Sequence, residues 1–193
     1  MRSKRVWKVG SPLAGALVLA LCVGIASAAT IVGDNGDNVI TGTPRADRIK
    51  ALDGNDTVAA LAGPDKVNGG PGNDILSGGR GRDLIRGNLG DDRESGGPGA
   101  DLMFAGQGVD IVVGGRGNDT IFARAKADVN TLGADTVFAG PGNDLVFVRD
   151  GEPDVVSCGS GYDVVFADPQ DVIRPDCERV NVHAPKPNEG ASE

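Results

Sequence analysis

Aspartate recurs every nine residues through most of this chain, and no other feature is as able to do chemistry. Residues 69–86 read GGPGNDILS and GGRGRDLIR, with aspartate in the sixth place and an aliphatic residue in the eighth. Carboxylates aligned along one edge of a repeating fold would repel one another, by about 1 kcal/mol per pair in water. A divalent cation between them reverses that sign, and calcium prefers carboxylate and carbonyl oxygens. The spacing therefore predicts a series of calcium sites.

The repeat has one register along the chain. Ten units run without insertion from Gly33 to residue 122, seven extra residues follow at 123–129, and further units begin at Asn130, Ala139, Arg149 and Cys158, with Val148 as one extra residue. The sixth place holds Asn38 and then only aspartate: Asp47, Asp56, Asp65, Asp74, Asp83, Asp92, Asp101, Asp110, Asp119, Asp135, Asp144, Asp154 and Asp163. The eighth place is apolar in every unit except that of Glu94.

This pattern predicts a coil made of two units. Six residues of turn and three of strand form half a coil, so 18 residues complete one turn, and equivalent strands stack in parallel about 4.8 Å apart. The eighth side chain points between two sheets, while the seventh and ninth point outward. Glycine suits the turns because left-handed backbone angles cost it little. An alternative for each aspartate is that it caps its own glycine-rich turn.

The units GGPGNDILS, GGRGRDLIR, GGPGADLMF and GGRGNDTIF resemble the RTX calcium-binding nonapeptide GGxGxDxUx, and the resemblance extends over about residues 33–166. It implies an all-β parallel β-roll, a right-handed β-solenoid, with calcium held in the turns. The stretch from Cys158 to Cys177 looks like the cysteine-bearing C-terminal cap of similar bacterial proteins. The predicted metal ligands are Asp56, Asp65, Asp74, Asp83, Asp92, Asp101, Asp110, Asp119, Asp135, Asp144 and Asp163, with Gly70, Gly72, Gly79, Gly81, Gly97, Gly99, Gly106, Gly108, Gly115 and Gly117.

The composition favours cations as binding partners and argues against nucleic acid. The chain carries a formal charge of −8 with a pI near 4.6, whereas nucleic-acid binding needs a basic patch. Zinc is not expected, because the single histidine, His183, lies near the C-terminus. The carboxylates are periodic, as expected of ligands, and no catalytic constellation or phosphate loop is visible. The chain is therefore predicted not to be an enzyme.

The two ends differ in composition from the array. Residues 1–28 combine a basic start, an apolar run from Leu13 to Ile25 and a final Ala-Ser-Ala, which predicts a cleaved secretory signal peptide. The alternative is a membrane anchor, although the run is shorter than the roughly 20 residues of a span. Residues 29–182 would then form the secreted, extracellular roll with its cap, and residues 183–193 a disordered tail.

Signal removal leaves two cysteines, Cys158 and Cys177, which predicts a disulfide in an exported chain. Two free buried thiols are the alternative. A bridge would close a loop of about 20 residues and add roughly 3 kcal/mol of stability.

Two departures from the repeat invite interpretation. Glu94 stands where an aliphatic residue belongs, and a bulge that turns it outward is expected, with an ion pair to Arg93 or Arg86 as the alternative. Outward places late in the array predict an aromatic ladder of Phe104, Phe122, Phe147 and Phe166 on one face. That face would serve a protein partner or self-association, unless the insertion or the C-terminal segment covers it.

Overall fold

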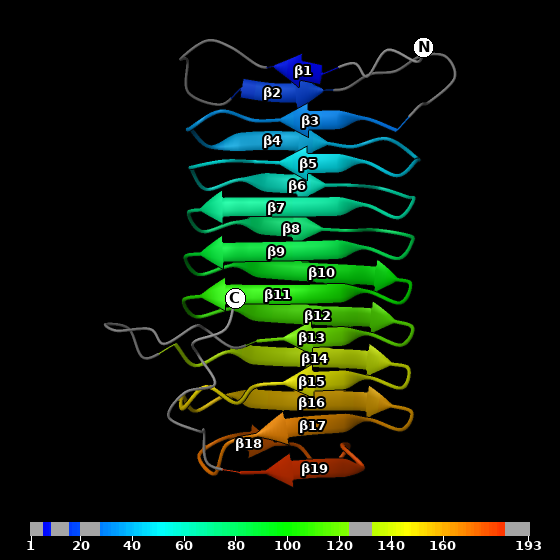
Figure 1. Ribbon diagram of the computed structural model, residues 1–193, viewed down its shortest axis with the longest axis vertical. Coiled ribbons are helices and arrows are strands. Elements are labelled where there is room, and N and C mark those ends of the chain that lie inside the picture. Colours follow the sequence, from blue (N-terminus) through cyan, green and yellow to red (C-terminus); the bar gives the residue numbers. More distant parts are fainter. Residues whose placement is uncertain (1–5, 9–15, 20–27, 124–132, 184–193) are drawn as a thin grey trace.

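The computed structural model describes residues 6–8, 16–19, 28–123 and 133–183. It is a parallel β-solenoid in which the chain winds back and forth between two facing sheets (Figure 1). Sheet A contains β1 (Val6–Lys8), β3 (Thr30–Val32), β5 (Arg48–Lys50), β7 (Lys66–Pro71), β9 (Leu84–Leu89), β11 (Leu102–Gln107), β13 (Thr120–Phe122), β15 (Leu145–Phe147), β17 (Val164–Ala167) and β19 (Arg179–Val182). Sheet B contains β2 (Ala16–Leu19), β4 (Asn38–Thr41), β6 (Thr57–Ala59), β8 (Ile75–Ser77), β10 (Arg93–Pro98), β12 (Ile111–Arg116), β14 (Thr136–Pro141), β16 (Val155–Ser160) and β18 (Val172–Ile173).

Strand register confirms the predicted coil of two units. Arg48 pairs with Lys66, and Lys66 pairs in turn with Leu84, so equivalent positions two units apart lie side by side. The sequence offset between paired residues lengthens to 25 between β12 and β14, and it is 19 between β14 and β16. Seven extra residues and one extra residue therefore lie outside the repeat, as predicted, although most of the segment 123–129 falls outside the described residues.

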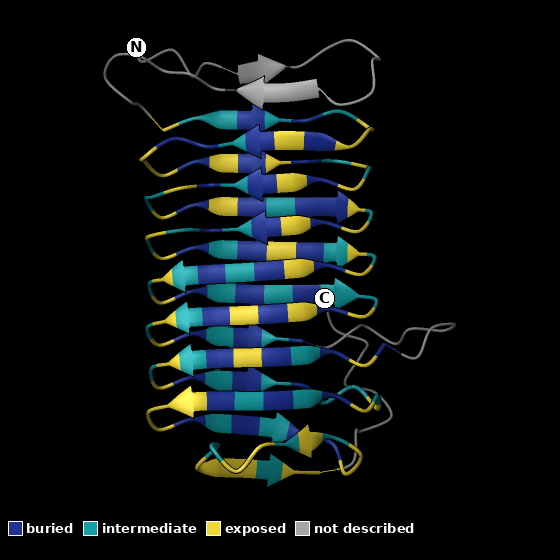
Figure 2. Ribbon diagram, turned by 180° about the vertical axis from the view of Figure 1, so that it is seen from behind, coloured by how far each residue is buried: buried dark blue, intermediate teal, exposed yellow. Residues whose placement is uncertain are grey.

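The core is a file of aliphatic side chains between the sheets. Eighth-place residues such as Ile49, Ile85 and Val137 have no exposed surface, while their neighbours on either side face outward (Figure 2). The first place also faces inward, since Ala51 and Ala60 are fully buried. This second inward position was not predicted, because its glycines and alanines look like turn residues in the sequence.

Several strands are longer than the three residues expected. Seven strands have six residues, because their last two residues also pair with a neighbouring coil, as Gly97 does with Gly115. The structure also adds β3 before the first predicted unit, and its Ile31 lies in register with Ile49. The hydrophobic file therefore begins earlier than the glycine pattern indicates.

The prediction that Glu94 turns outward is wrong. Glu94 pairs in register with Leu76 on one side and Val112 on the other, so β10 has no bulge there. The side chain is 2% exposed, and neither carboxyl oxygen has a hydrogen-bond partner among the described residues. The alternative ion pair is also absent from the described part of the chain, where Arg86 lies over the ring of Phe104 instead. Regular pairing on both sides outweighs the cost of burying one carboxyl group.

The predicted aromatic ladder is confirmed on the outer face of sheet A. Phe104, Phe122, Phe147 and Phe166 stack with ring centroids 4.6–4.9 Å apart and ring planes within 6° of parallel. Arg86 covers the first ring at 5.0 Å, and Arg149 lies 5.8 Å from the last ring. The four rings therefore form one continuous stack along this face.

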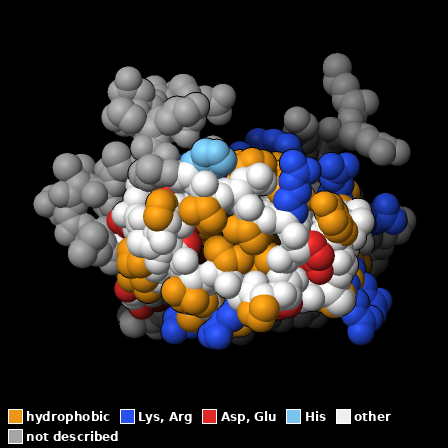
Figure 3. Space-filling model, turned by 90° about the horizontal axis from the view of Figure 1, so that it is seen from below, with side chains coloured by type: hydrophobic (Ala, Val, Ile, Leu, Met, Phe, Trp, Pro, Cys, Tyr) orange, Lys and Arg blue, Asp and Glu red, His pale blue; other side chains and the backbone are white. Residues whose placement is uncertain are grey.

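A disulfide closes the C-terminal end, as predicted. Cys158 and Cys177 are joined with their Cα atoms 5.1 Å apart, and the buried Cys158 occupies the first place of its unit. β18, which lies between the two cysteines in the chain, and β19, which follows Cys177, form the final coil. Figure 3 views this end of the stack, where apolar side chains gather at the centre, and Val172, Val180 and Val182 are exposed in this coil.

The proposed signal peptide lies mostly outside the described residues, and its cleavage stays a prediction. Its two described segments, β1 and β2, pair with β3 and β4 and extend the two sheets by one coil. Residues 184–193 of the predicted tail are also outside the described residues. Within the described part of the chain, no helix is long and apolar enough to cross a membrane.

Candidate metal sites

The sixth-place aspartates form two continuous ladders, one along each edge of the solenoid. The backbone N–H of each aspartate donates a hydrogen bond to Oδ1 of the aspartate one coil further on, at 2.8 Å in ten links of the central and later coils. The first ladder precedes the strands of sheet B and contains Asn38, Asp56, Asp74, Asp92, Asp110, Asp135 and Asp154. The second ladder precedes the strands of sheet A and contains Asp47, Asp65, Asp83, Asp101, Asp119, Asp144 and Asp163.

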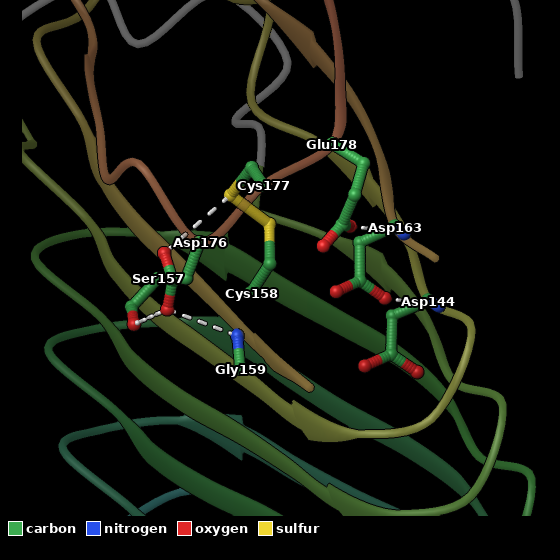
Figure 4. Close-up of a disulfide and its surroundings, with 8 residues drawn as sticks. All are labelled: Asp144, Ser157, Cys158, Gly159, Asp163, Asp176, Cys177 and Glu178. Carbon is green, nitrogen blue, oxygen red and sulfur yellow. Dashed lines mark hydrogen bonds between the residues drawn. A yellow bond between two sulfur atoms is a disulfide. The ribbon is translucent and has the colours of Figure 1, made fainter. Parts of the chain in front are cut away.

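Acidic residues of the cap end both ladders. Asp154 N–H donates to Oδ1 of Asp171 at 3.1 Å, and Asp163 N–H donates to Oε2 of Glu178 at 2.9 Å. Figure 4 shows Asp144, Asp163 and Glu178 in line beside the disulfide. Sequence reasoning missed Asp171 and Glu178, because the last coil is shortened and the nine-residue count no longer reaches them.

A neighbouring acid fastens the cap. Oδ2 of Asp176 accepts hydrogen bonds from Ser157 Oγ at 2.7 Å and from the Gly159 backbone N–H at 3.0 Å (Figure 4). The Ser157 hydroxyl is the main cause that holds the pKa of the Asp176 carboxyl below its ordinary value. These contacts fix the chain directly beside Cys177, so the disulfide and the end of the ladders form one unit.

The second carboxylate oxygen of eleven ladder aspartates has no partner among the described residues. Oδ2 is buried and accepts no hydrogen bond within the described structure in Asp56, Asp65, Asp74, Asp83, Asp92, Asp101, Asp110, Asp119, Asp144, Asp154 and Asp163. The residues themselves are at most 2% exposed. A buried carboxylate oxygen without a partner is costly, because it has lost its water and gained nothing.

This burial raises the pKa of the ladder carboxyls. Desolvation is the largest cause throughout, and it raises the pKa of Asp56 to about 6, of Asp65 to about 7 and of Asp92 to about 8. The backbone N–H of the preceding coil lowers the pKa in each case, and neighbouring carboxylates raise it further. The ladders therefore hold either protons or a compensating positive charge.

Glycine geometry in the turns brings backbone oxygens toward the ladders. Second- and fourth-place glycines such as Gly79 and Gly81 adopt φ values of 96° and 149°, as predicted. At the first place, a Cβ added to Gly114 would lie 2.7 Å from Asp119 Oδ2 and would also strike the carbonyl oxygen of Ala139 in the next coil. The unpartnered Oδ2 and a carbonyl oxygen of the next coil thus face the same space.

Any cation here must use backbone as well as side-chain oxygens. Among the described residues, no group of three or more His, Cys, Asp or Glu side chains could hold a metal ion. Calcium accepts mixed carboxylate and carbonyl ligands in flexible geometry, whereas zinc needs nitrogen or sulfur. The donor set fits calcium. All eleven predicted aspartates lie in the ladders, as does Asp154, which was not among the predicted ligands, and their role as ligands stays a prediction.

The alternative role, in which aspartate serves the backbone, is also present. Oδ1 caps an amide of the neighbouring coil rather than its own turn, although among the hydrogen bonds between described residues Asp47 also binds its own turn, through Thr43. One oxygen therefore satisfies the backbone and the other stays available, so the two interpretations are not exclusive.

The two ladders lie in different electrostatic surroundings. Surface acids adjoin the first ladder, where Asp37 and Asp53 raise the pKa of Asp56 further, after burial. The turns of the second ladder carry cations instead, among them Arg45, Arg80 and Arg116. Exposed carboxylates therefore lie near the buried ones of the first ladder, whereas arginine side chains at the surface partly balance the negative charge of the second ladder.

Comparison with known proteins agrees with this geometry. The family model described as RTX calcium-binding nonapeptide repeat (4 copies) matches residues 32–67, 60–94, 68–103, 86–121, 95–128 and 131–153. A search of curated proteins found no significant match to the chain. The matched segments cover well over half of the chain, and they coincide with the coils that carry the two aspartate ladders. The chain therefore belongs to the RTX calcium-binding nonapeptide repeat family.

Proposed function

We propose that this chain is an exported structural protein whose β-roll folds when calcium binds between its coils. One observation carries the proposal: eleven ladder aspartates each keep one buried carboxylate oxygen without a partner in the described structure. At neutral pH these oxygens would repel one another across successive coils. Calcium would bind them together with turn carbonyls, so that the same residues that oppose folding of the metal-free chain stabilise the loaded one.

Export would bring the chain to the calcium concentration that folding requires. External calcium is abundant and cytosolic calcium is scarce, so a chain of this kind would stay unfolded until it leaves the cell. The predicted signal peptide and the disulfide between Cys158 and Cys177 both support an extracellular location. Secretion and calcium-dependent folding thus form one proposal.

A structural role is favoured over catalysis. The carboxylates of the ladders are equivalent by translation from coil to coil, whereas an acid–base pair needs two carboxyls in different environments. The chain has a single histidine, His183, which follows β19 at the end of the described residues. We therefore propose that the protein is not an enzyme.

Circular dichroism during a calcium titration tests the proposal on residues 29–193. We expect a disordered spectrum in chelator and a cooperative gain of β signal at submillimolar to millimolar calcium, as is typical of extracellular sites. Equal order in excess chelator at neutral pH would contradict it.

A matched pair of variants assigns the effect to the ladders. Asp101→Asn keeps an oxygen that can accept the hydrogen bond from Asp83 N–H but removes the charge at Oδ2, so it should raise the calcium midpoint several-fold and remove bound ions in calorimetry. Asp53→Asn removes an exposed charge that lies near the first ladder but is not part of it, and should change the midpoint much less. Equal effects of both substitutions would mean that only net charge matters.

A second candidate function is that of an interaction or adhesion protein with calcium as its structural ion. The outer face of sheet A favours it, because that face combines the phenylalanine stack with basic side chains.

A further inference from the structure

We propose that one outer face of sheet A docks on an anionic lipid surface. The surface in question, the basic-apolar face, consists of the outward side chains of β5, β7, β9 and β11. Two rows run along it in register, one of Arg48, Lys66, Leu84 and Leu102, the other of Lys50, Asn68, Arg86 and Phe104. The face carries four cations and no acid, in a chain with a net charge of −8.

These cations are not neutralised within the described structure. Arg48, Lys50 and Lys66 are exposed, and their side chains make no hydrogen bond or ion pair with any described residue. Arg48 and Lys66 stand directly opposite each other in neighbouring strands, and like charges in that position destabilise a sheet. An anionic partner would relieve this repulsion.

Apolar side chains continue both rows. Leu84 and Leu102 are half-buried neighbours in β9 and β11, and Phe104 follows Arg86 in the other row. A soluble polyanion would neutralise the cations but leave these side chains in water. Anionic lipid offers both a negative headgroup layer and an apolar layer beneath it, which is the combination that basic and aromatic interfacial surfaces recognise.

Shape and charge disfavour other occupants. The strands of sheet A stack one above another in a straight row (Figure 1), which presents a broad, extended face that a planar surface can cover. A second copy of this face would bring cations against cations. A planar, fluid and negatively charged surface requires neither a pocket nor self-complementarity.

Vesicle co-sedimentation of calcium-loaded residues 29–193 tests the inference. We expect binding to vesicles of phosphatidylcholine mixed with phosphatidylglycerol, weaker binding at high salt and little binding to phosphatidylcholine alone. Lys50→Glu/Lys66→Glu should reduce partitioning at least about tenfold. Arg93→Glu, an exposed site on sheet B, is the matched control and should change partitioning much less. Equal loss in both, or no binding to anionic vesicles, would overturn the proposal.

A second pair of variants separates lipid from other partners. Leu84→Ser/Leu102→Ser should weaken vesicle binding, while Ile75→Ser/Ile111→Ser on sheet B, at side chains 51% and 36% exposed, should not. Binding to soluble dextran sulfate that matches vesicle binding in strength and does not depend on the leucines would overturn the lipid assignment. So would a stable dimer, in light scattering, that Phe104→Ser/Phe147→Ser dissolves.

The inference rests on the proposed calcium-dependent fold, and the two can fail separately. Circular dichroism of each sample reports whether the roll has folded. A folded roll that ignores anionic vesicles contradicts lipid docking alone, whereas a roll that is ordered in chelator contradicts the calcium proposal alone.

Discussion

At the scale of the residue, eleven of the ladder aspartates divide their two oxygens between two tasks. Oδ1 accepts the amide of the preceding coil, which aligns successive turns, and Oδ2 remains buried and unsatisfied. At the start of the array Asn38 differs, because its Oδ1 accepts the amide of Asp34 in its own turn rather than an amide of a preceding coil. The second task needs a charge, and this explains why aspartate occupies the remaining thirteen sixth places.

Glu94 is also a buried carboxyl without a hydrogen-bond partner among the described residues, but it does not belong to either ladder. Burial, followed by the charges of Asp110 and Asp92, holds the pKa of its carboxyl well above the ordinary value of 4.5. We expect Glu94→Val to raise the free energy of unfolding of the calcium-loaded roll by about 2 kcal/mol, because it removes an unpartnered polar group from the core.

The control for this substitution is Glu94→Gln, which keeps the shape and removes only the ability to ionise. It should change stability little, since the amide matches the carboxyl in size and burial disfavours the ionised form of the carboxyl. Thermal unfolding in calcium measures both variants. A loss of stability in Glu94→Val would show that the carboxyl makes a stabilising contact.

At the scale of the element, the turns depend on left-handed backbone at the second place. Leu52, Leu61 and Asn88 occupy this place with φ values of 87°, 85° and 89°. For leucine this conformation costs roughly 1–2 kcal/mol, because Cβ crowds the following carbonyl. The side chain of Leu61 is 43% exposed and so recovers little of that cost by burial.

Leu61→Gly should therefore stabilise the calcium-loaded roll by about 0.5–1 kcal/mol, after allowance for the greater freedom of glycine in the unfolded chain. Leu89→Gly provides the control, because Leu89 is 46% exposed but has no positive φ. That change should lower stability by a similar amount. Chemical denaturation measures both, and a loss of stability in both variants would contradict the strain argument.

The elements were predictable from the sequence to the extent that they repeat. The period fixed the eighth-place core, the outward phenylalanines and the positions of two insertions, because each depends on counting alone. Asp171 and Glu178 escaped prediction, since the shortened last coil breaks the count. Glu94 was misplaced, since its own chemistry favours water while the pairing of its neighbours holds it inside. The partner of Asp Oδ1, one coil away, depends on atomic geometry that no spacing reveals.

At the scale of the whole molecule, the two ladders make the stability of the metal-free roll depend on pH. Folding raises the pKa of Asp74 to about 7 and of Asp154 to about 9, against an ordinary value of 3.8. Between the ordinary pKa of 3.8 and these raised values, the folded chain binds more protons than the unfolded chain. The free energy of unfolding of the metal-free roll is therefore greatest at low pH and decreases as the pH rises through this range.

In chelator we therefore expect β signal to appear on acidification from about pH 8 to about pH 5, with no metal present. Calcium should flatten this dependence, while more calcium should be needed at low pH because protons compete for the same oxygens. Circular dichroism at a series of pH values, with and without calcium, measures both effects. A metal-free roll that loses order on acidification would contradict the raised pKa values.

The two lengthened coils of the array both take up their extra residues after a strand of sheet A, namely β13 and β15. Neighbouring coils above and below resume their pairing as though nothing had intervened. The turn that leads from sheet A to sheet B can therefore accept extra residues. The coil becomes longer there, while the pairing of its strands with the neighbouring coils stays the same. A foreign peptide inserted in this turn would be displayed at a position along the solenoid that is set by the choice of coil.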